Sequence, residues 1–413
     1  MLHRMRIALG ILVAMGCGDD VAPADALPDA PEEPAAIRVT RQSAPLAGIA
    51  VIFQRADSSI VAMTTTDADG AAAATIGEGG FVTAITSFAA EQDVKTFVGV
   101  SPGDQLVIDG APNAGTPMLS YTVRVSPVAG ALSYRVSVRC LVGTGESFVA
   151  PADPIDLPVT TRCLAPTETL VTALDGFGFP IQSVLGAEAT PTENGIVDLT
   201  NEVPVSAETA AITIANAPVA TMLESARSIG RVGFFAETEA ATNVVHPIVF
   251  PDVGGARQTI AITGERPVYV WGAASGAQTL DYATAAVAAI ADPSLDRATR
   301  TIAWTGGATA NFAFGQLVVE SGDASFLWSY AGPLTPGTRQ LQLPPLAAFP
   351  LATAMRADLE IGVGRVDAID ELRRDGAWLD ANNGLLARPQ TLLHAPSTPG
   401  SAGLAFTGSN LTF

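Results

Sequence analysis

The sequence predicts an all-β protein built from tandem β-sandwich domains, and three observations support this. Glycine and proline are frequent, with 39 and 29 copies spread along 413 residues, which suits many short strands joined by turns. Stretches such as Ile49–Gln54 alternate in their side chains with period two. Apolar residues make up 48% of the chain and charged residues only 15%, so a large core is expected.

Residues 1–16 have the pattern of a bacterial signal peptide. Basic side chains lie between His3 and Arg6, and Ile7–Met15 is an apolar run shorter than the ~20 residues that span a bilayer. The sequence Ala14-Met-Gly-Cys17 then resembles a lipoprotein lipobox. The resemblance implies cleavage before Cys17, a lipid on its sulfur, and anchoring in the bacterial cell envelope, in the outer membrane. The alternative is an ordinary signal peptide followed by an incidental cysteine.

Residues 17–35 are expected to be an acidic tether. They are rich in aspartate, glutamate, proline and alanine, have no basic side chain, and cannot bury apolar surface. No later run reaches the ~18 apolar residues of a transmembrane helix, so none is expected. The tether would join the lipid anchor to the first folded domain.

Residues 36–111 are predicted to form the first sandwich. Turn sequences rich in Gly, Asp and Pro separate its short strand candidates. The stretch Pro45–Phe53, the hairpin sequence Thr65–Gly70 and the strand Phe81–Ile85 resemble carboxypeptidase regulatory-like and bacterial Ig-like domains. That resemblance implies a β-sandwich, and such domains usually accompany a function without carrying it.

Asp67 and Asp69 raise the question of a calcium site in this domain. The sequence Asp67-Ala-Asp-Gly70 looks like part of a calcium loop, but Thr65 and Ile76 occupy the positions where an EF-hand has its first and last ligands. A hairpin turn explains the aspartates more simply, and we expect the turn.

Residues 112–203 are predicted to form the second sandwich. Tyr121–Val125 and Tyr134–Cys140 alternate Tyr, Val or Cys with polar side chains. Because arginines cannot face a core unpaired, the Tyr, Val and Cys face is expected to point inward. The run Thr122–Val138 resembles the second and third strands of a fibronectin type III domain.

Cys140 and Cys163 are predicted to form a disulfide bond. Cys140 lies on the inward face, and two such thiols are expected to pair in an oxidising compartment. A bridge of this kind stabilises by about 3 kcal/mol on the chain-entropy model. Two free buried thiols are the alternative.

Two more sandwiches are predicted, over residues 204–292 and 293–413. Alternating strands recur in both, and Thr301–Trp304 weakly repeats the pattern of the second sandwich. Helical signal is thin and is limited to Tyr282–Ala291 and Asp367–Arg374.

Several function classes are disfavoured by composition. A net charge of −19 and a pI near 4.4 argue against nucleic acid as a partner. The chain has no GxSxG motif, and His246 and His394 lie beside or between prolines, where ordinary loop or surface histidines are more common. Histidine and cysteine do not cluster at metal-ligand spacing. We therefore predict no catalytic residues, no metal site and no cofactor.

Carboxylates are the remaining candidates for chemistry. Asp367, Asp370 and Glu371 could supply an acid pair for glycoside hydrolysis. Beside Arg373 and Arg374 they look more like a solvated helix face whose charges pair internally.

Two pairs of aromatic residues could contact sugar rings. Tyr269 and Trp271 share one side of a predicted strand, and Trp328 and Tyr330 share one side of another, but core packing is the commoner role.

The leading hypothesis is a non-catalytic surface module for binding, adhesion or envelope structure. Its ligand would be a surface glycan or a protein. The alternative is a carbohydrate-active hydrolase that uses an Asp/Glu pair.

Overall fold

The structure is a computed structural model of the 413-residue chain. It describes residues 33–41, 44–88, 91–110, 118–138, 145–148, 152–161, 167–217, 221–229, 232–240, 245–251, 256–263, 266–272, 277–321, 324–347, 349, 351–367 and 400–412. These residues belong to one unit, Glu33–Phe413. They form 29 strands, one α-helix and a 3-10 turn at Leu351–Thr353, so the all-β prediction is confirmed.

The first sandwich packs a small sheet against four strands of a large one. The small sheet contains β1 (Ala35–Arg41), β2 (Ala44–Pro45), β5 (Ala71–Ala74) and β8 (Gln105–Gly110). The facing strands are β3 (Ala50–Gln54), β4 (Ile60–Thr65), β6 (Gly80–Phe88) and β7 (Glu91–Val100). Ile37, Val51, Phe53, Val82 and Phe97 lie buried in one core, because alternate residues of each strand point to the same face.

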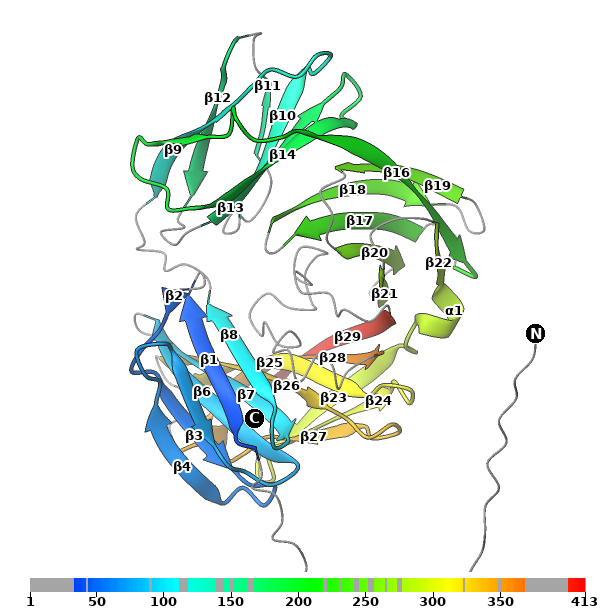
Figure 1. Ribbon diagram of the computed structural model, residues 1–413. Coiled ribbons are helices and arrows are strands. Elements are labelled where there is room, and N and C mark those ends of the chain that lie inside the picture. Colours follow the sequence, from blue (N-terminus) through cyan, green and yellow to red (C-terminus); the bar gives the residue numbers. More distant parts are fainter. Residues whose placement is uncertain are drawn as a thin grey trace, which may run out of the picture. The chain divides into compact units, whose positions relative to one another are not determined.

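The large sheet has 12 strands and joins segments that are far apart in the sequence (Figure 1). Its order is β18 (Val232–Ala240), β17 (Thr221–Ile229), β20 (Ala256–Thr263), β21 (Arg266–Gly272), β29 (Gly400–Thr412), β28 (Arg356–Val366), β25 (Phe312–Ser321), β26 (Ala324–Pro333), β7, β6, β3 and β4. Neighbouring strands run antiparallel except for the described pair β7 and β26, which is parallel. Three of the four predicted sandwich ranges thus contribute strands to one sheet.

The second sandwich follows the predicted alternation. One layer contains β12 (Ile155–Thr161), β9 (Leu119–Val125) and β15 (Ile196–Asp198). The other contains β11 (Gly145–Phe148), β10 (Ser133–Val138), β13 (Thr167–Leu174) and β14 (Pro180–Ala189). Tyr121 and Val123 of β9 are buried, while Arg124 points outward and its Nε lies 2.7 Å from Asp156 Oδ1. The inward Tyr and Val face is therefore confirmed for β9, as it is for β10.

Three further strands extend the sheet that contains β10, β11, β13 and β14. They are β16 (Val205–Ala215), β19 (Val245–Pro251) and β22 (Gln278–Asp281). The helix α1 (Tyr282–Ala285) follows β22. Asp281 is its N-cap, and the Asp281 side chain accepts a hydrogen bond from Thr284 N. The helix is shorter than the predicted Tyr282–Ala291, because Ala286 has an extended backbone and Val287 turns into a hydrophobic core.

The last sheet covers the face of the large sheet opposite the first sandwich core. It contains β23 (Ile290–Asp296), β24 (Thr301–Gly306) and β27 (Gln340–Gln342). Trp304 of β24 shares this core with Trp328 and Tyr330, both of which are buried. The predicted core role of Trp328 and Tyr330 is therefore confirmed. Within the described residues, no helix has the length and apolar character needed to cross a membrane.

Candidate functional site

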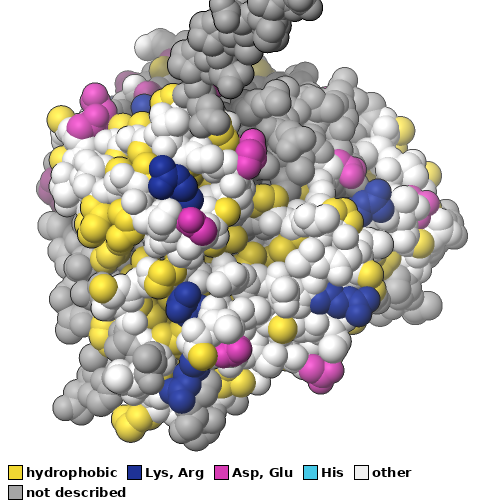
Figure 2. Space-filling model, turned by 90° about the horizontal axis from the view of Figure 1, so that it is seen from below, with side chains coloured by type: hydrophobic (Ala, Val, Ile, Leu, Met, Phe, Trp, Pro, Cys, Tyr) yellow, Lys and Arg dark blue, Asp and Glu magenta, His cyan; other side chains and the backbone are white. Residues whose placement is uncertain are grey.

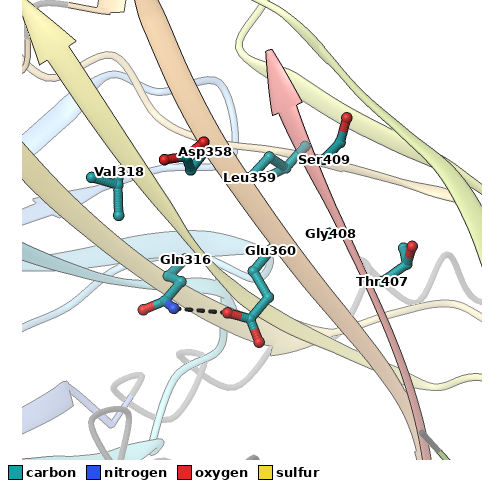
Figure 3. Close-up of a pocket in the computed structure, with 8 residues that line it drawn as sticks. All are labelled: Gln316, Val318, Asp358, Leu359, Glu360, Thr407, Gly408 and Ser409. Atoms are coloured by element: carbon teal, nitrogen blue, oxygen red, sulfur yellow. Dashed lines mark hydrogen bonds between the residues drawn. The ribbon is translucent and has the colours of Figure 1, made fainter.

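A groove of about 400 Å³ lies on the large sheet, where β25, β28 and β29 run side by side (Figure 3). Eight residues line it. They are Gln316 and Val318 of β25, Asp358, Leu359 and Glu360 of β28, and Thr407, Gly408 and Ser409 of β29.

Strand register explains how these residues meet. Gln316 is directly opposite Glu360, and Glu360 is directly opposite Gly408. In β28 the residues alternate, so Leu359 faces the core while Asp358 and Glu360 stand on the other face. Gly408 has no side chain and is exposed, which leaves the space above β29 open. The groove is thus a hollow in a sheet face, lined by polar side chains together with Val318.

Hydrogen bonds and an ion pair hold the polar side chains of the groove. Gln316 Nε2 donates to Glu360 Oε2 at 2.8 Å (Figure 3). Arg356 Nη2 lies 3.4 Å from Asp358 Oδ1 at the start of β28. The two carboxylates are two residues apart on one strand, which puts their Cα atoms roughly 7 Å apart.

Tyr330 supports β28 from the opposite face of the sheet. Its hydroxyl donates to the backbone oxygen of Glu360 at 2.9 Å. Burial is the main reason that the pKa of Tyr330 is raised well above its ordinary value, and the charge of Glu360 raises it further. The phenol therefore keeps its proton and remains a donor that fixes the backbone beneath the groove.

The same register continues as a polar row across the sheet. Gln316 is opposite Ser329 of β26, and Ser329 is opposite Lys95 of β7. Lys95 is the one lysine of the chain, and it is 1% exposed. Its Nζ lies 3.3 Å from Asp93 Oδ2. A buried charge pair on the sheet thus lies in register with the groove.

The arrangement can accept hydrogen bonds from a ligand. Carboxylate oxygens of Asp358 and Glu360 are strong acceptors for hydroxyl, amide or ammonium groups. The structure shows no group of three or more His, Cys, Asp or Glu side chains, among its described residues, that could hold a metal ion. Among the coloured side chains on the face shown in Figure 2, acidic and basic side chains are interspersed.

Several residues that were singled out from the sequence lie outside the described residues. This applies to Cys17, Cys140, Cys163, Asp370, Glu371, Arg373, Arg374 and His394. Asp367 lies in an exposed turn after β28. His246 belongs to β19, opposite Ile212, and Tyr269 and Trp271 belong to β21.

Asp67 and Asp69 have the hairpin-turn geometry that we expected. Asp67 Oδ1 accepts hydrogen bonds from the backbone N–H groups of Asp69 and Ala71, both at 2.9 Å. Gly70 completes the turn with a φ of 71°. The Asp67 carboxylate thus serves the turn between β4 and β5.

Sequence reasoning missed the groove. No pattern in the sequence connects Glu360 with Gln316 or with Gly408. Polar residues at alternate positions in the first half of β28, from Arg356 to Glu360, were the one local signal, and solvated strand faces show the same pattern.

Comparisons with known proteins give no family for this chain. No family model matches, and no curated protein matches. The Bacillus anthracis TIE protein aligns at 12% identity and a TM-score of 0.17, over 60% of this chain and 49% of its own. Chicken CNTN1 FN1–FN3 domains align at 8% identity and a TM-score of 0.14, over 60% and 90%. The native form of E. coli alpha-2-macroglobulin aligns at 12% identity and a TM-score of 0.15, over 91% and 29%. We draw nothing about function from similarities at this level.

Proposed function

We propose that the chain is a non-catalytic binding module displayed on the bacterial cell envelope. The groove between β25, β28 and β29 is its ligand site. One observation carries this proposal: the carboxylates of Asp358 and Glu360 stand on one face of β28 in the groove, and Gln316 of the paired strand β25 holds Glu360 through a 2.8 Å hydrogen bond. Preorganised acceptors on a rigid element suit recognition of a ligand.

The chemistry of the groove limits the ligand. Its carboxylates only accept hydrogen bonds when ionised, so the ligand must supply donors. The amide of Gln316 already uses one donor on Glu360. Hydroxyl-rich or amine-bearing molecules meet this need, which favours a surface glycan or a polar protein segment.

The N-terminus supplies the anchor in this proposal. A lipid on Cys17 holds the chain in the outer membrane, and residues 17–34, which precede β1, act as a tether. Fully extended, this tether reaches about 60 Å at ~3.3 Å per residue. Cys17→Ser is expected to release the protein from the membrane fraction and to abolish labelling by a fatty-acid probe. Membrane retention of the Cys17→Ser chain would contradict the anchor and leave the groove proposal standing.

Filling the groove tests the binding function. A Cβ atom at Gly408 meets only Leu359 O at 3.6 Å, an ordinary contact, so Gly408→Val fills space without displacing backbone. Gly77→Val is the matched control, since nothing lies within 4 Å of a Cβ there. All variants carry Cys17→Ser for solubility and are screened on glycan and peptide arrays.

The expected result is a ligand that binds the parent chain and Gly77→Val equally and Gly408→Val at least about tenfold more weakly. Equal binding by all three chains would place the ligand site elsewhere. Reproducible hydrolysis of arrayed glycans by the parent chain would replace the binding function with the hydrolase alternative.

A further inference from the structure

The large sheet ends at β4, a strand with an open edge. Among the described residues β4 pairs with β3 alone, and it is the last strand in the order of the sheet (Figure 1). Its side chains are accessible: Ile60 is 56% exposed and Met63 is 68% exposed. An open edge strand is a template for pairing with another strand.

The hydrogen bonds of Thr66 show which backbone groups of β4 face outward. Thr66 N donates to Ile49 O at 2.9 Å, and Thr66 O accepts from Gly48 N at 2.9 Å, so both groups of Thr66 point toward β3. Direction alternates along an antiparallel strand. Met63 and Thr65 therefore point their N–H and C=O groups away from β3. The outward oxygen of Thr65 accepts a hydrogen bond from Thr64 Oγ1 at 3.5 Å.

The edge lacks the features that usually prevent pairing. Residues 58–66 read SSIVAMTTT and contain no charged residue and no proline. Lysine, proline and inward charges are the common protections of natural edges. The one irregularity is a register shift near Gln54 and Ile60, which leaves Ala62–Thr65 regularly paired with β3.

We propose that β4 pairs antiparallel with β4 of a second copy of this chain. The chain carries a net charge of −19, so two copies repel each other over most approaches, and a charge-free edge lets them meet without like-charge contact. A strand that pairs with itself antiparallel forms a two-fold, self-complementary interface. The proposal stands independently of the groove and its ligand.

The outward groups fix the possible registers. Outward residues must face outward residues across the new ladder, so the two-fold axis passes through a residue and not between two residues. Met63 and Thr64 are the central residues of the regular stretch Ala62–Thr65, so an axis through either of them pairs the largest part of β4. With the axis at Met63, Val61 faces Thr65; with the axis at Thr64, Met63 faces Thr65. Neither register sets a charged residue of β4 against another. A dimer of this kind would carry two grooves and bind a repetitive ligand with higher avidity.

Sedimentation of the Cys17→Ser chain over a micromolar to submillimolar range tests the proposal. We expect a concentration-dependent dimer and, for Met63→Lys, a dissociation constant raised at least about tenfold by charge repulsion at the edge. Met355→Lys is the matched control, because Met355 is 59% exposed and precedes β28. A monomer at every concentration would overturn the proposal, as would equal weakening by Met355→Lys.

Cysteine cross-linking supplies the second measurement. Met63→Cys and Thr64→Cys place a thiol on each candidate axis, where it meets its own copy. One of them should give a disulfide-linked dimer on a non-reducing gel, and the parent chain should not. A sedimenting dimer that neither cysteine cross-links would place the interface elsewhere and overturn the pairing of β4.

Discussion

Lys95 Nζ lies 3.3 Å from Asp93 Oδ2 inside the sheet, with the lysine side chain 1% exposed and the aspartate side chain 12% exposed. Both residues stand on one face of β7, two positions apart. Taking two charges out of water is costly, and their attraction offsets that cost only while both are present.

Removing one member of this pair is therefore expected to be costly. Lys95→Met should lower the free energy of unfolding by about 3 kcal/mol, because it removes the cation that lies 3.3 Å from the buried Asp93 carboxylate. The double variant Lys95→Met/Asp93→Leu should recover part of that loss. Urea unfolding of the parent, single and double variants measures both effects. A single variant as stable as the parent would contradict the buried-pair interpretation.

A hydrogen-bonded chain joins β26 to β7 and β6. Trp328 Nε1 donates to Thr96 Oγ1 at 2.8 Å, and Thr96 Oγ1 lies 2.9 Å from Thr83 Oγ1. All three side chains are buried. Thr96→Val keeps the shape but leaves the indole N–H without its acceptor, which should cost about 1–3 kcal/mol. Thr160→Val, at an exposed position of β12, should be near neutral in the same thermal and urea measurements.

The alternation of polar and apolar residues predicted which face of each strand is buried, because that property depends on the strand's own sequence. The buried faces of Tyr121–Val125 and Tyr134–Val138 were predicted because every second residue shares a face. Trp328 and Tyr330 were correctly expected in a core for the same reason. The helix at Tyr282 was predicted too long, because alanine-rich sequence favours a helix wherever packing does not override it.

Pairing between distant strands could not be predicted in this way. Trp328 and Thr96 are 232 residues apart, and no local pattern specifies that β7 and β26 run parallel. The groove has the same origin, because it needs the register that sets Glu360 between Gln316 and Gly408. Asp367, Asp370 and Glu371 were considered instead because they are neighbours in the sequence.

Acid should weaken the fold through its hydrogen-bonded aspartates. The pKa of Asp281 is lowered mainly by a hydrogen bond from Asn216 and next by one from Thr284. A hydrogen bond from Thr299 lowers the pKa of Asp296, and one from Arg124 lowers the pKa of Asp156. A folded-state pKa below the unfolded value of about 3.9 contributes stability above that pH, and the contribution is lost as pH falls through the folded value.

The measurement for these aspartates is the melting temperature between pH 7 and pH 2. We expect a plateau near neutrality and a steady decline once the pH falls below about 4. Asp281→Asn removes one such group and should make the decline shallower. An identical pH profile for Asp281→Asn would show that Asp281 does not contribute.

The proposed disulfide between Cys140 and Cys163 can be tested by peptide mapping. In exported protein, non-reducing digestion should yield one peptide pair that contains both cysteines. Cys140→Ser/Cys163→Ser should lower stability by about 3 kcal/mol on the chain-entropy model. Two thiols that alkylate in the native exported chain would rule the bridge out.

Two glycines of the large sheet should respond in opposite ways to a methyl group. A Cβ at Gly315 of β25 would collide with the backbone oxygen of Glu360 and with the ring of Tyr330, which is buried and cannot move aside. Gly315→Ala must therefore separate β25 from β28, and we expect a loss of about 1–3 kcal/mol, as for an overpacked core.

Gly408, on the other side of β28, has room for the same methyl group. Its Cβ position meets only Leu359 O at 3.6 Å, so Gly408→Ala should be neutral or slightly stabilising, because alanine restricts the unfolded chain. Urea unfolding of the two variants side by side measures the contrast. Since Gly408 borders the groove, a stable Gly408→Ala chain also supports the use of Gly408→Val to fill it. A large loss at Gly408 with none at Gly315 would contradict the register that joins β25, β28 and β29.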